Sequence, residues 1–233
     1  MGIVRIAHLY PKELNLYGDS GNVLCLCKRL IKRGYGVEIC EIGIGDIIPD
    51  FDIMFIGGGQ DKEMRIIESD LRRKSEMLSY CVNSGKTVFA ICGGYQMLGE
   101  YYETKDNEVI KLSSALPFYT VGSDKRKIGN IVFETEVGKI VGFENHSGKT
   151  YLDDSLKPFG RVIKGYGNNG GKGEGVQFKN TIGTYAHGPV LPKNPALADN
   201  LIMRALGVKK LEDIDDEIEV LCHNSLISHF IKI

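Results

Sequence analysis

The 233-residue sequence contains no tryptophan, no C-x-x-C pair and no apolar run of membrane-spanning length. Its six cysteines are scattered along the chain. We therefore expect neither a disulfide framework nor a zinc site, and this cysteine usage fits a reducing compartment. The formal net charge of −1 argues against a nucleic-acid-binding surface. Because the first residues enter a strand-like pattern and not a signal peptide, we predict a cytoplasmic protein without a transmembrane segment.

The apolar content, 42% of residues, is enough to build a sizeable core. Strand-like patterns at 3–9, 37–42, 52–56 and 87–91 alternate with helical patterns at 23–31 and 62–83. This alternation predicts an α/β fold with a mostly parallel sheet covered on both faces and with sites at the carboxyl ends of its strands. After about residue 101 the pattern changes to short strands and turns, which predicts added antiparallel β segments. We treat 1–233 as one domain that closes with a helix at about 212–232.

The most informative segment is TVFAICGGYQMLG at 87–99. A short, β-branched, continuously apolar run that stops at a cysteine and two glycines is typical of a buried strand that turns sharply into a helix. The helix N-terminus would point N–H groups and its positive dipole end at Cys92 and favour the thiolate. A buried, inert cysteine is the alternative, but it would not require the two following glycines. We therefore predict that Cys92 is a nucleophile.

A second glycine-rich segment, GGGQD at 57–61, leaves another strand at the same edge of the predicted sheet. A backbone N–H near Gly59 and the N–H of Gly93 are expected to form an oxyanion hole beside Cys92. A flexible turn is the alternative interpretation. A dinucleotide-binding fingerprint is excluded, because the segment does not fit G-x-G-x-x-G at a helix start.

A catalytic thiol needs a general base, and imidazole is the usual choice near neutral pH. His187 is the best candidate of the five histidines, because it ends a strand and is followed by glycine and proline, which we expect to expose it. His8 and His146 are rivals near loops. His223 and His229 fall in the C-terminal helical pattern and are expected at the surface.

No motif for ATP or a metal ion is present. The segment SGKT at 147–150 is similar to the end of a phosphate-binding loop, but the glycine that such a loop requires would fall at Phe143. We therefore predict that this chain carries no cofactor of its own.

Four segments resemble the class I glutamine amidotransferases of the cobyric-acid-synthase (CobB/CobQ) type: IGGGQD at 56–61, AICGGYQ at 90–96, GFENHSG at 142–148 and GTYAHG at 183–188. They occur in the family's order, and the resemblance covers about residues 3–206. It implies a flavodoxin-like fold and hydrolysis of L-glutamine through a thioester on Cys92, with His187 protonating the departing ammonia. It also implies that Arg126, in the basic cluster 125–127, binds the substrate; a solvated basic turn is the alternative for such a cluster seen alone.

Within that family, NLYGDSGN at 15–22 and the lack of an attached ATP-binding domain resemble the glutaminase subunits of lipid II isoglutaminyl synthases. The resemblance implies a heterodimer with a Mur-ligase-like partner of the MurT type, which would supply ATP and any metal. Ammonia would then amidate the D-glutamate of the lipid II stem peptide. A cobyrinate-type amidotransferase subunit, a cysteine hydrolase and a non-enzymatic binding module on the same fold are the alternatives.

The sequence departs from many class I amidotransferases two residues after the histidine, where Pro189 replaces an orienting glutamate. Without an acidic neighbour, an imidazole is held less firmly in the required tautomer. Asp19 and Glu144 are candidates within this chain, and the partner subunit is the third source. The resemblance favours the partner, which predicts weak glutamine hydrolysis by the isolated chain.

Overall fold

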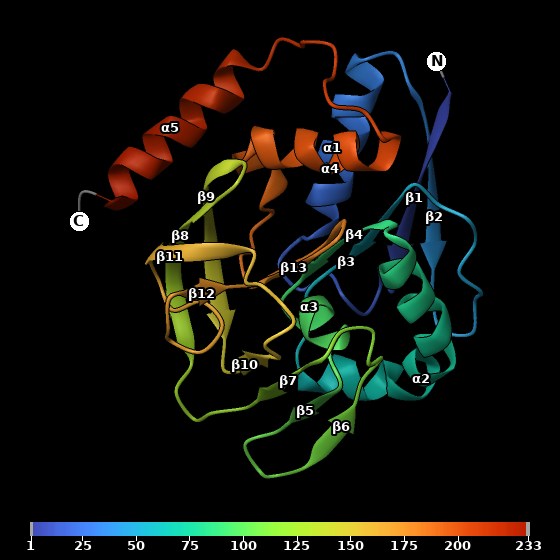
Figure 1. The fold of residues 1–233 in the computed structure, drawn as a ribbon, viewed down its shortest axis with the longest axis vertical. Helices are drawn as coiled ribbons and strands as arrows, with labels where there is room; N and C mark the ends of the chain where they lie inside the picture. The colour runs from blue at the N-terminus through green and yellow to red at the C-terminus, as the bar shows by residue number, and fades with distance from the viewer. Residues whose placement is uncertain (1, 232–233) are drawn as a thin grey trace.

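The computed structural model describes residues 2–231, which form a central six-stranded sheet with helices on both faces (Figure 1). The strand order is β13-β14-β4-β3-β1-β2, and every neighbouring pair is parallel except β13 and β14. The strands are β1 (Ile3–Leu9), β2 (Gly36–Ile42), β3 (Ile53–Ile56), β4 (Thr87–Ile91), β13 (Val176–Phe178) and β14 (Thr181–Thr184). The α/β prediction with a mostly parallel sheet is confirmed.

The helices that cover this sheet are α1 (Ser20–Lys32), α2 (Asp61–Ser84) and α4 (Pro195–Leu206). The β1-α1-β2 connection moves along the sheet in one direction and β3-α2-β4 in the other. Since such crossovers are right-handed, α1 and α2 lie on opposite faces. α4 packs on α1 and completes that layer, after the short 3₁₀ helix η1 (Leu191–Lys193).

Local sequence explains the central strands and the helix ends. All residues of β3 and β4 are buried, as expected for inner strands of a parallel sheet covered on both sides. α2 begins with a capping box between Gln60 and Glu63 and ends at Gly85, whose φ of 81° is the left-handed conformation common after helices. These signals place the carboxyl ends of β3 and β4 side by side.

Two four-stranded sheets are added to this core, as the change of pattern after residue 101 predicts. One has the order β10-β7-β5-β6 and the other β12-β11-β8-β9, and all pairs are antiparallel except β5 and β7. Their strands are β5 (Tyr101–Glu103), β6 (Val109–Lys111), β7 (Phe118–Val121), β8 (Lys127–Thr135), β9 (Gly138–His146), β10 (Lys149–Leu152), β11 (Gly160–Lys164) and β12 (Gly173–Glu174). A β-bridge between Phe143 and His187 joins the second sheet to the segment that follows β14.

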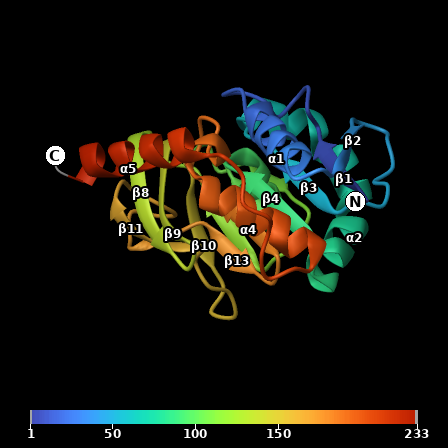
Figure 2. The ribbon, with the colours of Figure 1, turned by 90° about the horizontal axis from the view of Figure 1, so that it is seen from above.

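The C-terminal helix differs from the expectation. α5 (Glu217–Ile231) starts later than residue 212, and the predicted position 232 lies outside the described residues. None of its residues is buried, and Ile218 and Leu221 are exposed. It runs along β8, β9 and β11 with its end directed away from the central sheet (Figure 2). Within residues 2–231, no helix has the length and apolar character needed to cross a membrane.

Candidate active site

Cys92 lies at the corner between β4 and the short helix α3 (Gly93–Met97). Its backbone has φ 49° and ψ −108°, a conformation that L residues rarely adopt. The Cys92 N–H donates to the Thr184 carbonyl oxygen at 2.8 Å, and the Cys92 carbonyl accepts the Gln96 N–H at 2.9 Å. Neighbouring elements thus hold the strained residue in place, as in a nucleophile elbow.

The glycines on both sides of the corner are required by close packing. A Cβ at Gly93 would lie 2.6 Å from the Gly59 carbonyl oxygen, and a Cβ at Gly94 would lie 2.5 Å from the Gly57 carbonyl oxygen. The glycine loop is therefore a packed junction against the elbow and not a free turn. The Gly59 N–H has no hydrogen-bond acceptor among residues 2–231, and Gly93 is the first residue of α3, whose N–H has no partner within the helix.

His187 follows β14 and is fixed by its backbone. Its N–H donates to the Phe143 carbonyl at 2.7 Å, and the Phe143 N–H donates back at 3.3 Å. The prediction that His187 is exposed is wrong, because its side chain is only 1% exposed. The Tyr17 ring covers it edge-on at a centroid distance of 4.7 Å, and Gly58 packs against Cε1. Burial therefore comes from two loops that are distant in sequence.

The acid nearest to His187 within this chain is Asp19. Its Oδ1 lies 3.8 Å from His187 Nδ1, beyond hydrogen-bond distance, and its Oδ2 accepts the Gly58 N–H at 2.8 Å. Glu144, the other candidate within this chain, forms a hydrogen bond with a different group: its Oε1 accepts the Tyr166 N–H at 2.7 Å. The family resemblance favours an acid from the partner subunit; within residues 2–231, the structure places the buried Asp19 carboxylate near the ring but without a hydrogen bond to it.

The charges around His187 favour its protonated form. Burial lowers the pKa of His187, but the negative charge of Cys92 and the Asp19 carboxylate outweigh burial and raise it to about 10. Neither ring nitrogen meets hydrogen-bond geometry with residues 2–231, so we attribute both effects to charge at close range. A proton is therefore stable on His187 whenever the Cys92 sulfur is anionic, which suits an acid that protonates a leaving group.

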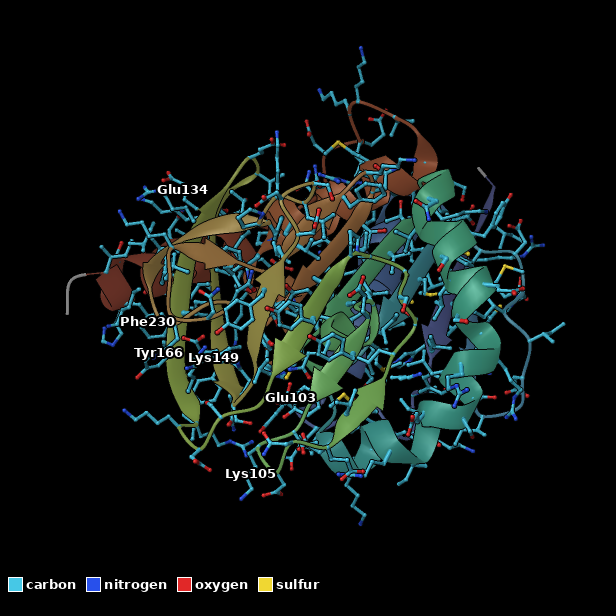
Figure 3. All side chains as sticks on the ribbon, turned by 60° about the horizontal axis from the view of Figure 1, so that its bottom comes forward. Glu103, Lys105, Glu134, Lys149, Tyr166 and Phe230 are labelled. Carbon is cyan, nitrogen blue, oxygen red and sulfur yellow. The ribbon has the colours of Figure 1, made fainter. Side chains whose placement is uncertain are left out.

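Cys92 and Arg126 line one cavity of about 400 Å³. Arg126 Nε donates to Asn145 Oδ1, and Asn145 Nδ2 donates to the Tyr17 hydroxyl at 2.6 Å. Arg126 forms no ion pair with any other described residue, so its charge is available to a ligand. The loop after β5 forms the outer rim, where Lys105 is exposed (Figure 3).

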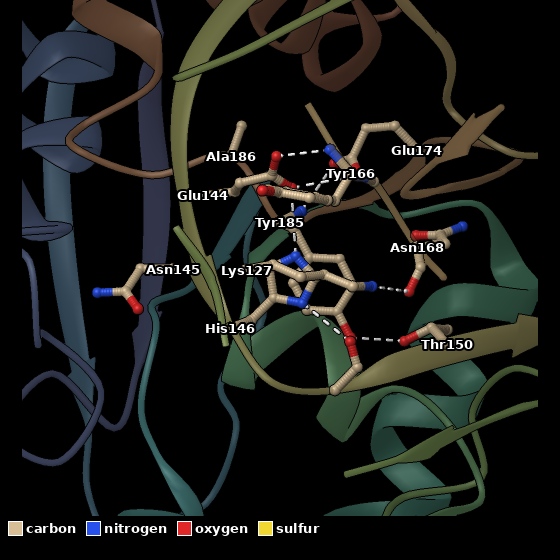
Figure 4. Close-up of polar contacts among 12 residues, drawn as sticks. Lys127, Glu144, Asn145, His146, Thr150, Tyr166, Asn168, Glu174, Tyr185 and Ala186 are labelled. Carbon is tan, nitrogen blue, oxygen red and sulfur yellow. Dashed lines mark hydrogen bonds and ion pairs between the residues drawn. The ribbon is translucent and has the colours of Figure 1, made fainter. Parts of the chain in front are cut away.

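His146 also lines the cavity but is held in a buried polar network (Figure 4). Its ring stacks on Tyr185 at 3.7 Å, Nδ1 lies 2.9 Å from the Gly148 carbonyl oxygen, and Nε2 lies 3.3 Å from Glu144 Oε2. Burial lowers the pKa of His146, although Glu144 acts in the opposite direction. With both ring nitrogens engaged, His146 serves as a wall of the cavity.

Sequence reasoning assigned no role to Tyr17, Asn145 or Tyr102, which the structure brings to the site. Tyr17 and Asn145 lie within segments that carry the family resemblance, and this was the available signal. No sequence signal pointed to Tyr102, which lies in the first added sheet. The structure gathers Cys92, Gly59 and Arg126 at one cavity, with Gly93 next to Cys92 in the chain and His187 beside the nucleophile.

Comparison with known proteins gives a consistent result. The model of the CobB/CobQ-like glutamine amidotransferase domain matches residues 5–195. The chain is 40% identical to the subunit GatD of the glutamine-hydrolyzing lipid II isoglutaminyl synthase of Staphylococcus aureus (strain N315), over 96% of this chain and 95% of that protein. It is 42% identical to GatD of Streptococcus pneumoniae (strain ATCC BAA-255 / R6), over 91% of this chain and 84% of that protein. A cobyrinate a,c-diamide synthase of Archaeoglobus fulgidus is 28% identical, but the match spans 37% of that protein.

Solved structures support the fold. A crystal structure of a glutamine amidotransferase superposes with a TM-score of 0.62 at 16% identity, covering 87% of this chain and 99% of that one. PurLQS from Thermotoga maritima gives a TM-score of 0.56 at 15% identity, covering 88% and 98%. At such low identity the likeness concerns the fold alone.

Proposed function

This chain belongs to the CobB/CobQ-like glutamine amidotransferase family, and from that membership we propose that it is the glutamine-hydrolysing subunit of a lipid II isoglutaminyl synthase. One observation carries the proposal: a strained cysteine and an arginine without an ion pair line one cavity, with a buried histidine beside the cysteine. The near-complete coverage of the GatD subunits supports this choice over the cobyrinate enzymes, of whose length the match spans about a third.

The proposed reaction begins with attack of the Cys92 sulfur on the side-chain amide carbon of L-glutamine. The Gly59 and Gly93 N–H groups stabilise the oxyanion, and each such donor contributes about 3 kcal/mol in known systems. His187 gives its proton to the departing ammonia and leaves a thioester on Cys92. His187 then accepts a proton from the water that hydrolyses the thioester to glutamate.

Arg126 is proposed to bind the α-carboxylate of glutamine. A guanidinium can form two parallel hydrogen bonds with a carboxylate, which fixes the orientation of the bound molecule. Asn145 engages Nε of Arg126, so the other nitrogens of the fork remain for the substrate. This arrangement would hold the amide end of glutamine at Cys92.

Released ammonia is proposed to pass to a Mur-ligase-like partner of the MurT type. That partner would bind ATP and any metal and would amidate D-glutamate in the lipid II stem peptide. The relatives are named as subunits, which supports a partner. We place the reaction in the cytoplasm, where ATP is available and the six free cysteines would remain reduced.

The test is ammonia release from L-glutamine by the purified chain, alone and with the co-purified ligase subunit, with Cys92→Ala as control. We expect release that requires Cys92 and is stronger with the partner, together with amidation of lipid II when ATP is added. Absence of release in both preparations would overturn the glutaminase assignment. Release without transfer to lipid II would overturn only the proposed acceptor.

A further inference from the structure

The cavity beside Cys92 contains a carboxylate that the mechanism above does not use. Asp61 is the first residue of α2 and directly follows the glycine loop at 57–60. It lines the cavity together with Cys92 and Arg126 and is half-buried. Among the described residues, the other acidic lining residue is Asp106, which is exposed on the loop between β5 and β6.

The surroundings of Asp61 place it close to the nucleophile. Burial raises the pKa of Tyr102 to about 12; the charge of Asp61 acts in the same direction, Ser147 acts against it, and Cys92 makes a smaller contribution that raises it. Tyr102 also lines the same cavity as Asp61 and Cys92, so the three residues meet at one cavity.

Chain geometry agrees with this placement. The Gly59 backbone packs directly against Gly93, the neighbour of Cys92. Asp61 is two residues further along, a span of at most about 7 Å. In glutamine, the amide carbon and the α-carbon are separated by roughly 4 Å of extended chain. A glutamine whose amide carbon lies at the sulfur thus brings its α-substituents into the range of Asp61.

Helix capping does not account for Asp61. The capping box of α2 is formed by Gln60 and Glu63, with the Gln60 N–H donating to Glu63 Oε2 at 3.0 Å. An additional acid in the first turn stabilises a helix by about 0.3–1 kcal/mol at exposed sites and by up to about 2 kcal/mol at partly buried ones, but it takes no part in these capping bonds. Asp61 forms no ion pair within residues 2–231, and the nearby Arg65 is paired with Glu108. No described residue therefore holds the Asp61 carboxylate in a salt bridge, although Lys62, Arg65 and Lys105 line the same cavity.

We propose that Asp61 binds the α-ammonium group of glutamine while Arg126 binds its α-carboxylate. This inference rests on the proposed glutaminase function and adds a specificity determinant to it. A zwitterion needs one site of each charge, and the cavity provides a free cation and a free anion beside the same nucleophile. Asp61 and Arg126 together select free amino acids, because a glutamine whose α-nitrogen is acylated or missing leaves the Asp61 carboxylate without a counter-charge.

The experiment compares two substrates that differ only at the α-position, L-glutamine and glutaramate, which has no amino group. Both are tested with the ligase complex containing the wild-type chain, Asp61→Asn or the control Asp154→Asn, an exposed acid outside the cavity, and ammonia release is measured. For Asp61→Asn we expect the KM for glutamine to rise at least tenfold with kcat little changed, because one hydrogen bond between charged groups is lost. The kcat/KM for glutaramate should stay the same or rise, and Asp154→Asn should change the kinetics of neither substrate.

Equal losses for both substrates, or no change for glutamine, would overturn the role of Asp61 while leaving Cys92-dependent hydrolysis intact. Failure of the wild-type complex to release ammonia from glutamine would instead overturn the glutaminase function and this inference with it. If glutaramate turns over too slowly to measure, calorimetric binding of both ligands to Cys92→Ala, with and without Asp61→Asn, gives the same comparison. There, a ratio of the two affinities that does not change with Asp61→Asn counts against the proposal.

Discussion

The Asp19 carboxylate gives the most direct test of how His187 is controlled. Its Oδ1 lies 3.8 Å from His187 Nδ1, and both side chains are buried. Asp19→Asn removes the charge but retains an oxygen that can accept the Gly58 N–H now bound at 2.8 Å. The substitution thus changes the electrostatics of His187 while keeping the anchor of the glycine loop.

The expected magnitude follows from the distance. Two unit charges 3.8 Å apart interact by about 4 kcal/mol at an effective dielectric constant of about 20. At 1.36 kcal/mol per unit, this corresponds to a change of about 3 in the pKa of His187. The sign is a decrease, because the carboxylate stabilises the imidazolium. Burial acts in the same direction, so without Asp19 and without a charge at Cys92 the imidazole should titrate below its usual 6.5.

The assay is an NMR titration of the His187 Cε1–H in the Cys92→Ala chain, with and without Asp19→Asn. Removing the thiol eliminates its coupled titration with the imidazole, so that the pKa belongs to His187 alone. Asp106→Asn, at the exposed rim of the cavity, is the matched control and should leave the value unchanged.

A shift smaller than one unit on Asp19→Asn would refute this electrostatic reasoning. It would leave Asp19 as an anchor for Gly58 and return the orienting role to an acid of the partner subunit. A full shift, together with a large loss of glutamine hydrolysis by the complex, would instead assign that role to Asp19. The weak activity expected of the isolated chain would then need another cause, such as an oxyanion loop ordered by the partner.

Three further predictions concern the oxyanion loop, substrate binding and stability. Gly93→Ala places a Cβ 2.6 Å from the Gly59 carbonyl oxygen, so kcat for ammonia release should fall about 100-fold or more, whereas Gly2→Ala, with open space around it, should have no effect. Arg126→Ala should raise the KM for glutamine by about tenfold or more, and Arg126→Lys should restore only part of it, because lysine lacks the planar fork. Burial raises the pKa of Glu174 from 4.5 to about 7, so the folded state retains a proton that the unfolded state releases in this range. The free energy of unfolding should therefore fall by up to about 3 kcal/mol as pH rises through that window, and urea titrations of Glu174→Gln should show a flatter dependence.

Each of these predictions has a result that contradicts it. Normal kcat in Gly93→Ala would place the oxyanion donors elsewhere. An unchanged KM for glutamine in Arg126→Ala would favour the alternative interpretation, in which the basic cluster 125–127 is a solvated turn. Parallel stability curves for the wild type and Glu174→Gln would mean that Glu174 remains ionised in the folded protein across this pH range.

The elements that the sequence predicted well are those whose signals are local. The buried run at 87–91 and the helix that ends at Gly85 follow from apolar pattern and capping residues, so their bounds agree with the structure within a residue or two. The nucleophile elbow has its own local signature in Cys92 and the two glycines. A continuous pattern of this kind does not depend on what packs against it.

The environment of His187 could not be predicted in the same way. Its burial and its acidic neighbour arise from the loop that carries Tyr17 and Asp19, about 170 residues earlier in the chain. Nothing in the residues around position 187 indicates which distant loop folds over them. The contact that occupies Glu144 likewise depends on folding, because the Tyr166 N–H that it accepts lies in the turn after β11, 22 residues along the chain.

The three consecutive glycines of the oxyanion loop pack against different atoms: the outer two face Leu14 and the middle one faces His187. An added Cβ would lie 2.0 Å from the Leu14 carbonyl oxygen at Gly57, 2.9 Å from His187 Cε1 at Gly58 and 2.5 Å from the Leu14 side chain at Gly59. Any missense change in these codons adds at least that carbon. Substitutions at these three positions should therefore not be neutral. Their effects should differ, because a side chain at Gly58 would displace the proton donor His187, whereas one at Gly57 or Gly59 would displace the N-terminal loop at Leu14.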